Sequence, residues 1–442
     1  MIAVQDAISL ARPARNLVSA GELFRRTNYV TLKVTYGCNL RCTYCNAETI
    51  PAGGRVPLMT IERFRKIVDT VAESSMMPML GLEFHGGEPM LLSDEFLEQA
   101  VEYAREKVRA APVPKTQLRF TTQTNGTLLT DRRLELLQRL GICVGLSLDG
   151  PPAINQVYRQ GTAGTVEAIR RLRKHGMSFG MLMVLSRANW DKMPEVMDYF
   201  SGEGVRSFRI NIVQPQGRGV GLDILLSGRQ LLRAKTDIFW HMMRNRCRVL
   251  EADVLNTVKK FIAGRVGDPP LSCWSSECQA ARTYFAIDLR GDIHACGTDL
   301  THWKIGNIDE PVDWEHYEEL LRRLHHKDAW YVRCFDCAAK KICAFSCATT
   351  NHNSTEYREH ECDFTKRFWD FLNEHAAEAR ELYEMAAPAM RWPPLSYCDD
   401  LRRRGKVADG PAPPSAVYQL SALPPRVRPA AAGASLGAGG AS

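Results

Sequence analysis

Hydrophobic positions between residues 29 and 213 follow two alternating spacings, one typical of strands and one typical of helices. Segments with helical spacing predict helices at 60–75, 94–109, 131–140, 165–175 and 193–200. Short runs rich in β-branched and apolar residues predict six strands, at 29–35, 80–84, 117–122, 142–148, 179–185 and 208–213. Strands that alternate with helices in this way predict an α/β fold with a parallel sheet and crossover helices.

Polar, glycine-containing segments follow the second, third and fourth predicted strands, at residues 83–90, 124–127 and 147–151. In parallel sheets the chemistry gathers at the carboxyl ends of the strands, where these segments lie. Paired glycines allow a ligand to approach the backbone closely, and Glu88 or Asp149 then accepts hydrogen bonds from an ammonium or a ribose. Each glycine pair alone is equally consistent with an ordinary turn, but their common position at successive strand ends favours a site.

Three cysteines follow the first predicted strand, Cys38, Cys42 and Cys45. Three thiolates on one loop can hold three irons of a [4Fe-4S] cluster and leave the fourth iron open for a small molecule. Zinc is the alternative, but a structural zinc site is closed by four ligands, and the sequence near this loop does not complete such a set.

A second group of cysteines lies near the carboxyl end of the chain, within ninety residues. Gly291 stands where a tight turn would bring the chain back towards a metal. Two zinc sites of four cysteines each would use the same number of ligands, so spacing alone leaves zinc and iron-sulfur open. The eight cysteines are Cys273, Cys278, Cys296, Cys334, Cys337, Cys343, Cys347 and Cys362.

The first triplet, with Tyr44 before its last cysteine, resembles the radical S-adenosylmethionine superfamily over residues 29 to 215. The resemblance implies a partial (β/α)6 TIM-like barrel with a [4Fe-4S] cluster at its mouth and S-adenosyl-L-methionine (AdoMet) on the open iron. The segment 86–89 resembles that family's contact to the amino group of the cofactor. The residues expected to bind AdoMet are Gly86, Gly87, Glu88, Pro89, Asn125, Ser147 and Asp149.

The C-terminal cysteines resemble the SPASM domain, an extension of this superfamily that holds two further [4Fe-4S] clusters, so the resemblance implies three clusters in all. By that resemblance, Cys273, Cys278, Cys296 and Cys347 ligate the cluster nearer the active site. The outer cluster is then ligated by Cys334, Cys337, Cys343 and Cys362. Neither auxiliary cluster has an open iron, which favours electron transfer over substrate ligation.

The resemblance implies a peptide maturase. In such an enzyme a 5′-deoxyadenosyl radical takes a hydrogen from a ribosomal precursor peptide. A carbon-carbon, carbon-oxygen or thioether crosslink then forms, and the auxiliary clusters accept the surplus electron. The expected partners are the precursor peptide and an electron donor such as flavodoxin or ferredoxin. Sulfatase-maturating members of the family have an aspartate base directly after the third auxiliary cysteine, where this chain has Gly297. Asp299 is the candidate proton acceptor in its place, and the departure argues against sulfatase maturation.

Two alternatives to the crosslinking maturase remain. One is anaerobic sulfatase maturation, which is formylglycine formation on a Cys or Ser. The other is a zinc-stabilised binding scaffold without enzymatic activity, for which a colourless, iron-free protein would be the sign.

Composition predicts a reduced, cytoplasmic protein without a membrane segment, because no run of eighteen apolar residues occurs and the first twenty residues lack a signal peptide's apolar core. Eleven of the fourteen cysteines are assigned to clusters, and Cys143, Cys247 and Cys398 are expected as isolated thiols. The formal net charge of +7 does not indicate a nucleic-acid partner, since three clusters would lower the net charge to about +2.

The expected domain plan has six parts. Residues 1–28 are too short for the peptide-recognition domain that some maturases carry, so leader recognition is expected on a separate protein. Apolar positions at Phe368, Trp369, Phe371 and Leu372 predict one helix from 365 to 385. The parts are an N-terminal leader (1–28), the barrel (29–225), a bridge of two helices (226–265), the SPASM domain (266–364), a C-terminal helix (365–390) and a Pro/Ala/Gly-rich, disordered tail (391–442).

Overall fold

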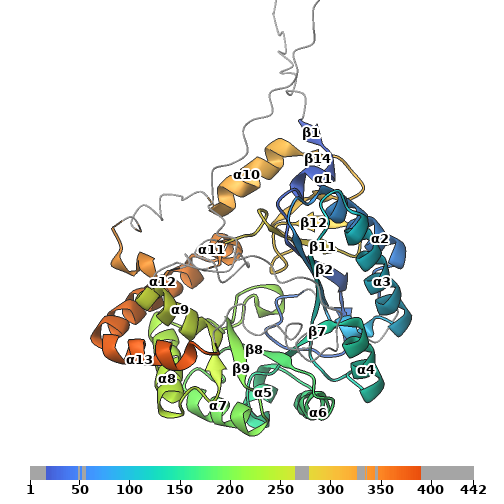
Figure 1. Ribbon diagram of the computed structural model, residues 1–442. Coiled ribbons are helices and arrows are strands. Elements are labelled where there is room, and N and C mark those ends of the chain that lie inside the picture. The colour runs from blue at the N-terminus through green and yellow to red at the C-terminus, as the bar shows by residue number, and fades with distance from the viewer. Residues whose placement is uncertain are drawn as a thin grey trace, which may run out of the picture. The chain divides into compact units, whose positions relative to one another are not determined.

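The parallel sheet expected from the sequence is the centre of the computed structural model shown in Figure 1. The structure describes residues 16–47, 50–51, 56–263, 278–325, 334, 336–343 and 347–389. The predicted tail at 391–442 and two cysteines, Cys273 and Cys398, lie outside the described residues. Among the described helices, none is both long enough and apolar enough to cross a bilayer.

Six parallel strands lie side by side in the order in which they occur along the chain. Their predicted positions are confirmed, with ends that differ by at most two residues. Sequential order is what right-handed crossover connections produce in a barrel-like sheet. The strands are β2 (Tyr29–Thr35), β5 (Met79–Gly86), β6 (Gln117–Thr124), β7 (Ile142–Ser147), β8 (Phe179–Leu185) and β9 (Ser207–Ile212).

The crossover helices lie on the outer side of these strands (Figure 1). Three of them begin at hydroxyl N-caps, because the side chains of Thr60, Ser93 and Thr130 accept hydrogen bonds from backbone amides three residues on. One short helix, α5 (Pro152–Tyr158), has no counterpart in the prediction. The predicted helices are α2 (Ile61–Ser74), α3 (Asp94–Ala110), α4 (Asp131–Leu140), α6 (Thr162–Lys174) and α7 (Met193–Gly202).

The sheet continues beyond the six predicted strands at both edges. At one edge, β10 (Leu250–Glu251) pairs in parallel with β9. At the other, β11 (Tyr284–Asp288) pairs in parallel with β2, and β12 (Asp292–His294) and β13 (Lys304–Asn307) follow as antiparallel strands. The segment that carries Cys296 is therefore hydrogen-bonded into the same ten-stranded sheet as the first cysteine loop.

The C-terminal helix expected at 365–385 is two helices, α12 (Thr355–Glu374) and α13 (Ala376–Ala386), and the prediction of one helix is wrong. Helix α12 begins ten residues earlier than expected, because the side chain of Ser354 caps it by accepting from the Tyr357 amide. It ends at His375, whose backbone leaves the helical region and whose ring packs on Phe371 with centroids 4.7 Å apart. Cys362 consequently lies on this helix.

Two helices, α8 (Gly228–Arg244) and α9 (Ala252–Ala263), form the predicted bridge. Part of the predicted leader is also ordered: β1 (Leu17–Val18) pairs with β14 (Val312–Asp313), and α1 (Ala20–Leu23) follows. The remaining described elements are β3 (Gly37–Cys38), β4 (Ile50–Pro51), α10 (Trp314–His325), α11 (Ala348–Asn353) and the single turns η1 (Pro89–Leu91), η2 (Gly217–Gly219) and η5 (Ala338–Lys341).

Phe285 tests whether β11 belongs to the core. Its side chain is fully buried, and its ring meets Phe24 edge-on with centroids 5.2 Å apart. We expect Phe285→Ala to lower the free energy of unfolding by about 3–5 kcal/mol, because the deletion leaves a cavity. Denaturant unfolding measures this, and Met76→Ala, at a side chain that is 56% exposed, is the control and should change stability by about 0.5 kcal/mol or less. Similar losses in the two variants would contradict a core role for β11.

Candidate active site

The carboxyl ends of the parallel strands open into a cavity of about 1460 Å³. The first cysteine loop lines this cavity with all three of its cysteines. Four C-terminal cysteines line it as well, although they are more than 230 residues away in the sequence. The cavity-lining cysteines of these two groups are Cys38, Cys42, Cys45, Cys278, Cys296, Cys343 and Cys347, and Cys143 lines the cavity as well.

The first cysteine loop presents three free thiols. It is held in shape by hydrogen bonds from the Cys45 amide to the Cys42 carbonyl, at 3.3 Å, and from the Leu40 amide to the Cys38 sulfur, also at 3.3 Å. Burial raises the pKa of the Cys38 thiol to about 11, and it also raises that of Cys42. Three thiols that face one cavity are the donor set that three irons of a [4Fe-4S] cluster require, so the residues fit this group.

The glycine pair Gly86–Gly87 contacts the chain's own backbone. A Cβ at Gly86 would overlap the Thr35 carbonyl oxygen, and a Cβ at Gly87 would overlap the Gly37 carbonyl. The Gly87 and Glu88 amides donate to these same two carbonyls, at 2.8 and 2.7 Å. The first cysteine loop is therefore the close neighbour of this glycine pair, and the approach of a ligand to the same backbone stays a prediction.

Glu88 is buried, with 1% of its surface exposed, and its carboxylate binds three donors of this chain. One oxygen accepts from the Met90 amide at 2.9 Å and the Thr124 hydroxyl at 2.6 Å, and the other accepts from the Asn125 amide at 2.9 Å. Burial raises the pKa of Glu88 despite these bonds. Glu88 thus joins the end of β5 to the end of β6, while its side chain still borders the cavity.

Asn125 and Ser147 lie at the ends of β6 and β7 and line the cavity, as the prediction requires of cofactor contacts. The Asn125 side-chain amide donates to the Asn39 oxygen at 2.8 Å, which ties the cysteine loop to β6. The Ser147 hydroxyl accepts from the Gln123 amide at 2.8 Å. Pro89 opens the turn η1 and is buried.

Asp149, also predicted to contact the cofactor, is turned away from the cavity and does not line it. Its carboxylate accepts from the Tyr44 hydroxyl and, at 3.0 Å, from the Val184 amide. The Arg159 Nε lies 2.9 Å from the Tyr44 oxygen and 3.4 Å from an Asp149 oxygen. This buried trio fixes Tyr44, which stands between Cys42 and Cys45, so Asp149 supports the cysteine loop from behind.

The described cysteines of the predicted inner set, Cys278, Cys296 and Cys347, all line the cavity. Of the predicted outer set only Cys343 lines it, and Cys334, Cys337 and Cys362 do not. The fourth inner ligand, Cys273, lies outside the described residues, so the division into two sets stays a prediction.

Asp299, the candidate proton acceptor, does not line the cavity. Its carboxylate accepts from the Thr301 and His302 amides, both at 3.0 Å, and from the His302 ring at 2.9 Å. Asp299 therefore closes its own loop in this structure, and its predicted catalytic role is without support from the geometry.

Cys143 is disulfide-bonded, so the expectation of an isolated thiol is wrong at this position. It lies on β7, is 5% exposed and borders the cavity. Cys247, expected to be isolated, is a free thiol.

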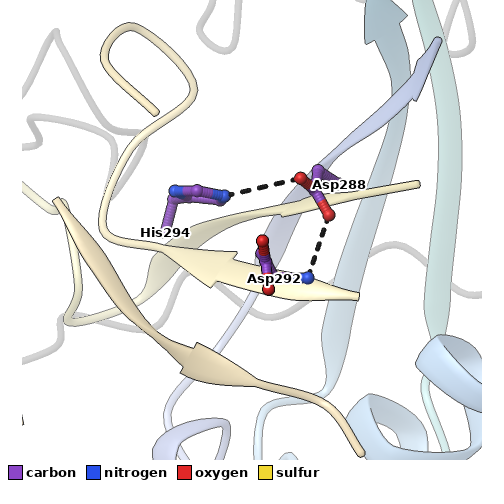
Figure 2. Close-up of side chains that lie close together, drawn as sticks. All are labelled: Asp288, Asp292 and His294. Carbon is purple, nitrogen blue, oxygen red and sulfur yellow. Dashed lines mark hydrogen bonds and ion pairs between the residues drawn. The ribbon is translucent and has the colours of Figure 1, made fainter. Parts of the chain in front are cut away.

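A cluster of charged residues lies at the β11–β12 turn (Figure 2), and sequence reasoning missed it. The Tyr36 hydroxyl, two residues before Cys38, donates to Asp288, and Arg290 lies 5.8 Å from the centre of the Tyr36 ring. Asp288 is fully buried and also accepts from the Arg290 and Asp292 amides, both at 2.9 Å. Burial would raise the pKa of Asp288, but these donors hold it well below its usual range.

Asp288, Asp292 and His294 have ligand atoms within 4.8 Å of one another, which is the composition of a small metal site (Figure 2). The carboxylates, however, already have cationic partners. Lys304 lies 2.8 Å from Asp292, and Arg290 lies 3.3 and 3.4 Å from Asp288 and Asp292. A dication would have to displace these charges, so the cluster acts as an ion-paired brace between the cysteine loop and the hairpin that leads to Cys296.

Comparison with known proteins agrees with this geometry. Residues 32–200 match the profile of the Radical SAM superfamily. The serine-type anaerobic sulfatase-maturating enzyme of Bacteroides thetaiotaomicron is 24% identical over 406 residues, which cover 83% of this chain and 94% of that enzyme. The antilisterial bacteriocin subtilosin biosynthesis protein AlbA of Bacillus subtilis is 25% identical over 357 residues, 76% of this chain and 71% of AlbA.

A solved structure, native anSMEcpe with bound AdoMet and Cp18Cys peptide, has the same fold. The TM-score is 0.63 at 20% identity, over 79% of this chain and 99% of that chain. The expected TIM-like α/β fold is thereby confirmed.

Removal of the Tyr36 hydroxyl tests the brace. We expect Tyr36→Phe to cost about 1.5–3 kcal/mol in the free energy of unfolding, because a buried carboxylate loses a donor. Because the pKa of Asp288 is lowered in the folded state, its contribution is complete above the unfolded carboxyl pKa of about 3.9 and is lost only as the pH falls below it. The deficit of the variant, measured by denaturant unfolding, should thus persist from about pH 8 to about pH 5.

The matched control is Tyr103→Phe, which removes a hydroxyl that donates to Asp69 at 2.8 Å near the surface. This variant should lose less than about 1 kcal/mol, because solvent screens the pair. Equal losses in the two variants would show that Tyr36 has no special role.

Proposed function

We propose that this chain is a maturase that forms an oxidative crosslink in a ribosomal precursor peptide. The chain carries a radical SAM domain over residues 32–200 and is a radical SAM enzyme. The relation to enzymes of peptide and sulfatase maturation supports the coarser statement, a radical enzyme that acts on a polypeptide. The crosslink, of carbon-carbon, carbon-oxygen or thioether type, is the finer part of the proposal.

One observation carries the proposal: a single cavity is lined both by the first cysteine triplet and by Cys278, Cys296 and Cys347. A purely structural role for the C-terminal cysteines would not require them to face the cavity of the first triplet. A substrate in this cavity would lie between two groups of thiolate ligands, which is the arrangement that a hydrogen abstraction followed by electron removal needs.

The cofactors would be held by residues that line this cavity. Cys38, Cys42 and Cys45 would ligate the first [4Fe-4S] cluster, and two auxiliary clusters would take the C-terminal cysteines. When bound, the first cluster and AdoMet supply a 5′-deoxyadenosyl radical, and the auxiliary clusters supply an electron acceptor. An external donor such as flavodoxin or ferredoxin would deliver the initial electron.

The chain's own residues place and enclose AdoMet. We expect the turn at 86–89 to meet its amino group, with Asn125 and Ser147 on the neighbouring strand ends. Glu88 holds two of these strand ends together through its three donors, and the Tyr44–Asp149–Arg159 trio fixes the cysteine loop. Both devices keep the site in one geometry before substrate binds, which limits the reorganisation that the reaction requires.

Sulfatase maturation is the second candidate, favoured by the relative that shares 94% of its length with this chain. Gly297 follows Cys296 in this chain, and Asp299 is bonded to its own loop. A formylglycine-forming reaction would need another proton acceptor in the cavity. These observations support our choice of the peptide crosslinking reaction over formylglycine formation.

The cluster assignment is tested by metal analysis of the anaerobically reconstituted protein. We expect about twelve irons per chain, falling to about eight when Cys38, Cys42 and Cys45 are all changed to Ala. The triple variant should not cleave AdoMet with dithionite, whereas Cys247→Ala, at a free thiol outside both groups, should keep the iron and the cleavage. About four irons with zinc retained would make the C-terminal cysteines structural and remove the proposed electron acceptors.

The reaction is tested with any short precursor peptide that is found encoded beside the gene. We expect AdoMet cleavage to 5′-deoxyadenosine to be coupled to the loss of two hydrogen atoms from such a peptide, with fragmentation that locates a crosslink. A sulfatase-derived peptide with a Cys or Ser at its modification site is the comparison. Formylglycine on that peptide, with the precursors unchanged, would favour the second candidate.

A further inference from the structure

Lys33 stands in the middle of β2 and projects into the cavity, and neither the cluster ligands nor the expected AdoMet contacts involve it. Its side chain is almost completely buried, since the residue is only 4% exposed. The neighbouring β2 residues Leu32 and Val34 are fully buried on the opposite face of the strand. Lys33 therefore places an amino group inside the barrel.

Among the described residues no carboxylate forms an ion pair with Lys33, although Glu83 acts on it electrostatically. Its single recorded partner is the His85 Nδ1, at 3.3 Å. Glu83, on the neighbouring strand, is bonded to the Thr31 hydroxyl at 2.6 Å. Burial lowers the pKa of Lys33, with Glu83 and the thiols of Cys296 and Cys45 opposing the shift.

His85 offers a second donor beside Lys33. Its Nδ1 accepts from the Gly86 amide at 2.7 Å, so this nitrogen carries no hydrogen in the neutral ring. The ring hydrogen is then on Nε2, and His85 lines the cavity. Burial and the nearby Lys33 lower the pKa of His85 well below its usual range, which keeps the ring neutral.

The backbone at Gly297 approaches Lys33 closely. A Cβ at position 297 would lie 3.2 Å from the Lys33 Cε and 3.1 Å from the Tyr284 hydroxyl oxygen. The backbone after Cys296 thus passes directly by Lys33 without a side chain between them. Lys33 and His85 line the same cavity as Cys45 of the first loop and Cys296, where the substrate would lie.

If the buried Lys33 side chain is protonated, a negatively charged group beside it would stabilise it. Burial of an ammonium costs several kcal/mol unless an opposite charge and hydrogen bonds compensate it. A neutral imidazole nitrogen supplies one hydrogen bond and no charge. A carboxylate has two oxygens, and it can accept from an ammonium and an imidazole N–H at the same time.

We propose that Lys33 and His85 form a binding site for a side-chain carboxylate of the peptide substrate, an Asp or Glu close to the residue that reacts. The inference rests on the proposed function in one respect, that the ligand is a peptide. The site would make the enzyme specific for acidic peptide segments and would set the distance of the reacting carbon from the cysteine loop.

Binding of two short peptides tests this proposal without turnover. The probes are Ac-Gly-Asp-Gly-NH2 and Ac-Gly-Asn-Gly-NH2, which differ by one charge at nearly equal size. Equilibrium dialysis against the anaerobically reconstituted enzyme with AdoMet gives their dissociation constants. We expect the Asp peptide to bind about tenfold or more tightly than the Asn peptide, because the neutral amide leaves the buried cation uncompensated.

Two pairs of variants assign the preference to Lys33. Lys33→Met should abolish it, whereas Arg206→Met, which removes an exposed cation lining the same cavity at the start of β9, should keep it. Gly297→Asp keeps Lys33 but places a tethered carboxylate beside it, and we expect the same loss of preference. Gly297→Asn adds the same bulk without the charge and should retain the preference.

Three results would overturn the proposal. They are equal affinities for the two peptides in the wild type, an unchanged preference in Lys33→Met, and a loss of AdoMet affinity in Lys33→Met as large as the loss of peptide affinity. The last result would assign the cation to AdoMet. Reductive cleavage of AdoMet by the same preparations reports on the proposed function independently, so a failure of the carboxylate site is distinguishable from a protein that is not a radical enzyme.

Discussion

The backbone contact between residues 35–37 and the turn at 86–88 is the constraint on which the rest of the site depends. Two amides of the turn donate to two carbonyls of the cysteine loop, and both glycines are required because a Cβ at either would overlap that loop. Backbone that passes this closely cannot shift without breaking both hydrogen bonds. The position of Cys38 relative to the expected AdoMet contacts is therefore set by main chain, and Glu88 extends the constraint to the next strand end.

Strand β2 also fixes the position of the C-terminal half of the chain relative to the first cysteine loop. It pairs with β5 on one side and with β11 on the other, and Tyr36, just beyond its end, is bonded to Asp288 at the end of β11. Because β12 follows directly and leads to Cys296, one strand positions both cysteine groups. Their separation is thus a property of sheet geometry, and a change in the β2–β11 pairing would alter it.

Local pattern was sufficient for the six parallel strands and their helices, since alternation and capping are encoded within each segment. It was insufficient for β11–β13, because the pairing of Ala286 with Thr31 joins residues more than 250 positions apart. The same limit explains Asp149: its chemistry suggests a ligand contact, but its partners Tyr44 and Arg159 come from elsewhere in the chain and turn it inward. Lys33 did carry a local signal, since it shares the alternation of Tyr29 and Thr31 on one face of the first strand.

The same alternation determines which side chains of β2 line the inside of the barrel. In β2 the residues Val30, Leu32 and Val34 are fully buried on one face, while Thr31 and Lys33 point to the cavity. A barrel interior packed as a core would carry branched apolar side chains on that second face. Hydroxyl, ammonium and carboxyl groups there are costly unless a ligand completes their interactions. The polar side chains on this face are consequently suited to a polar occupant of the cavity.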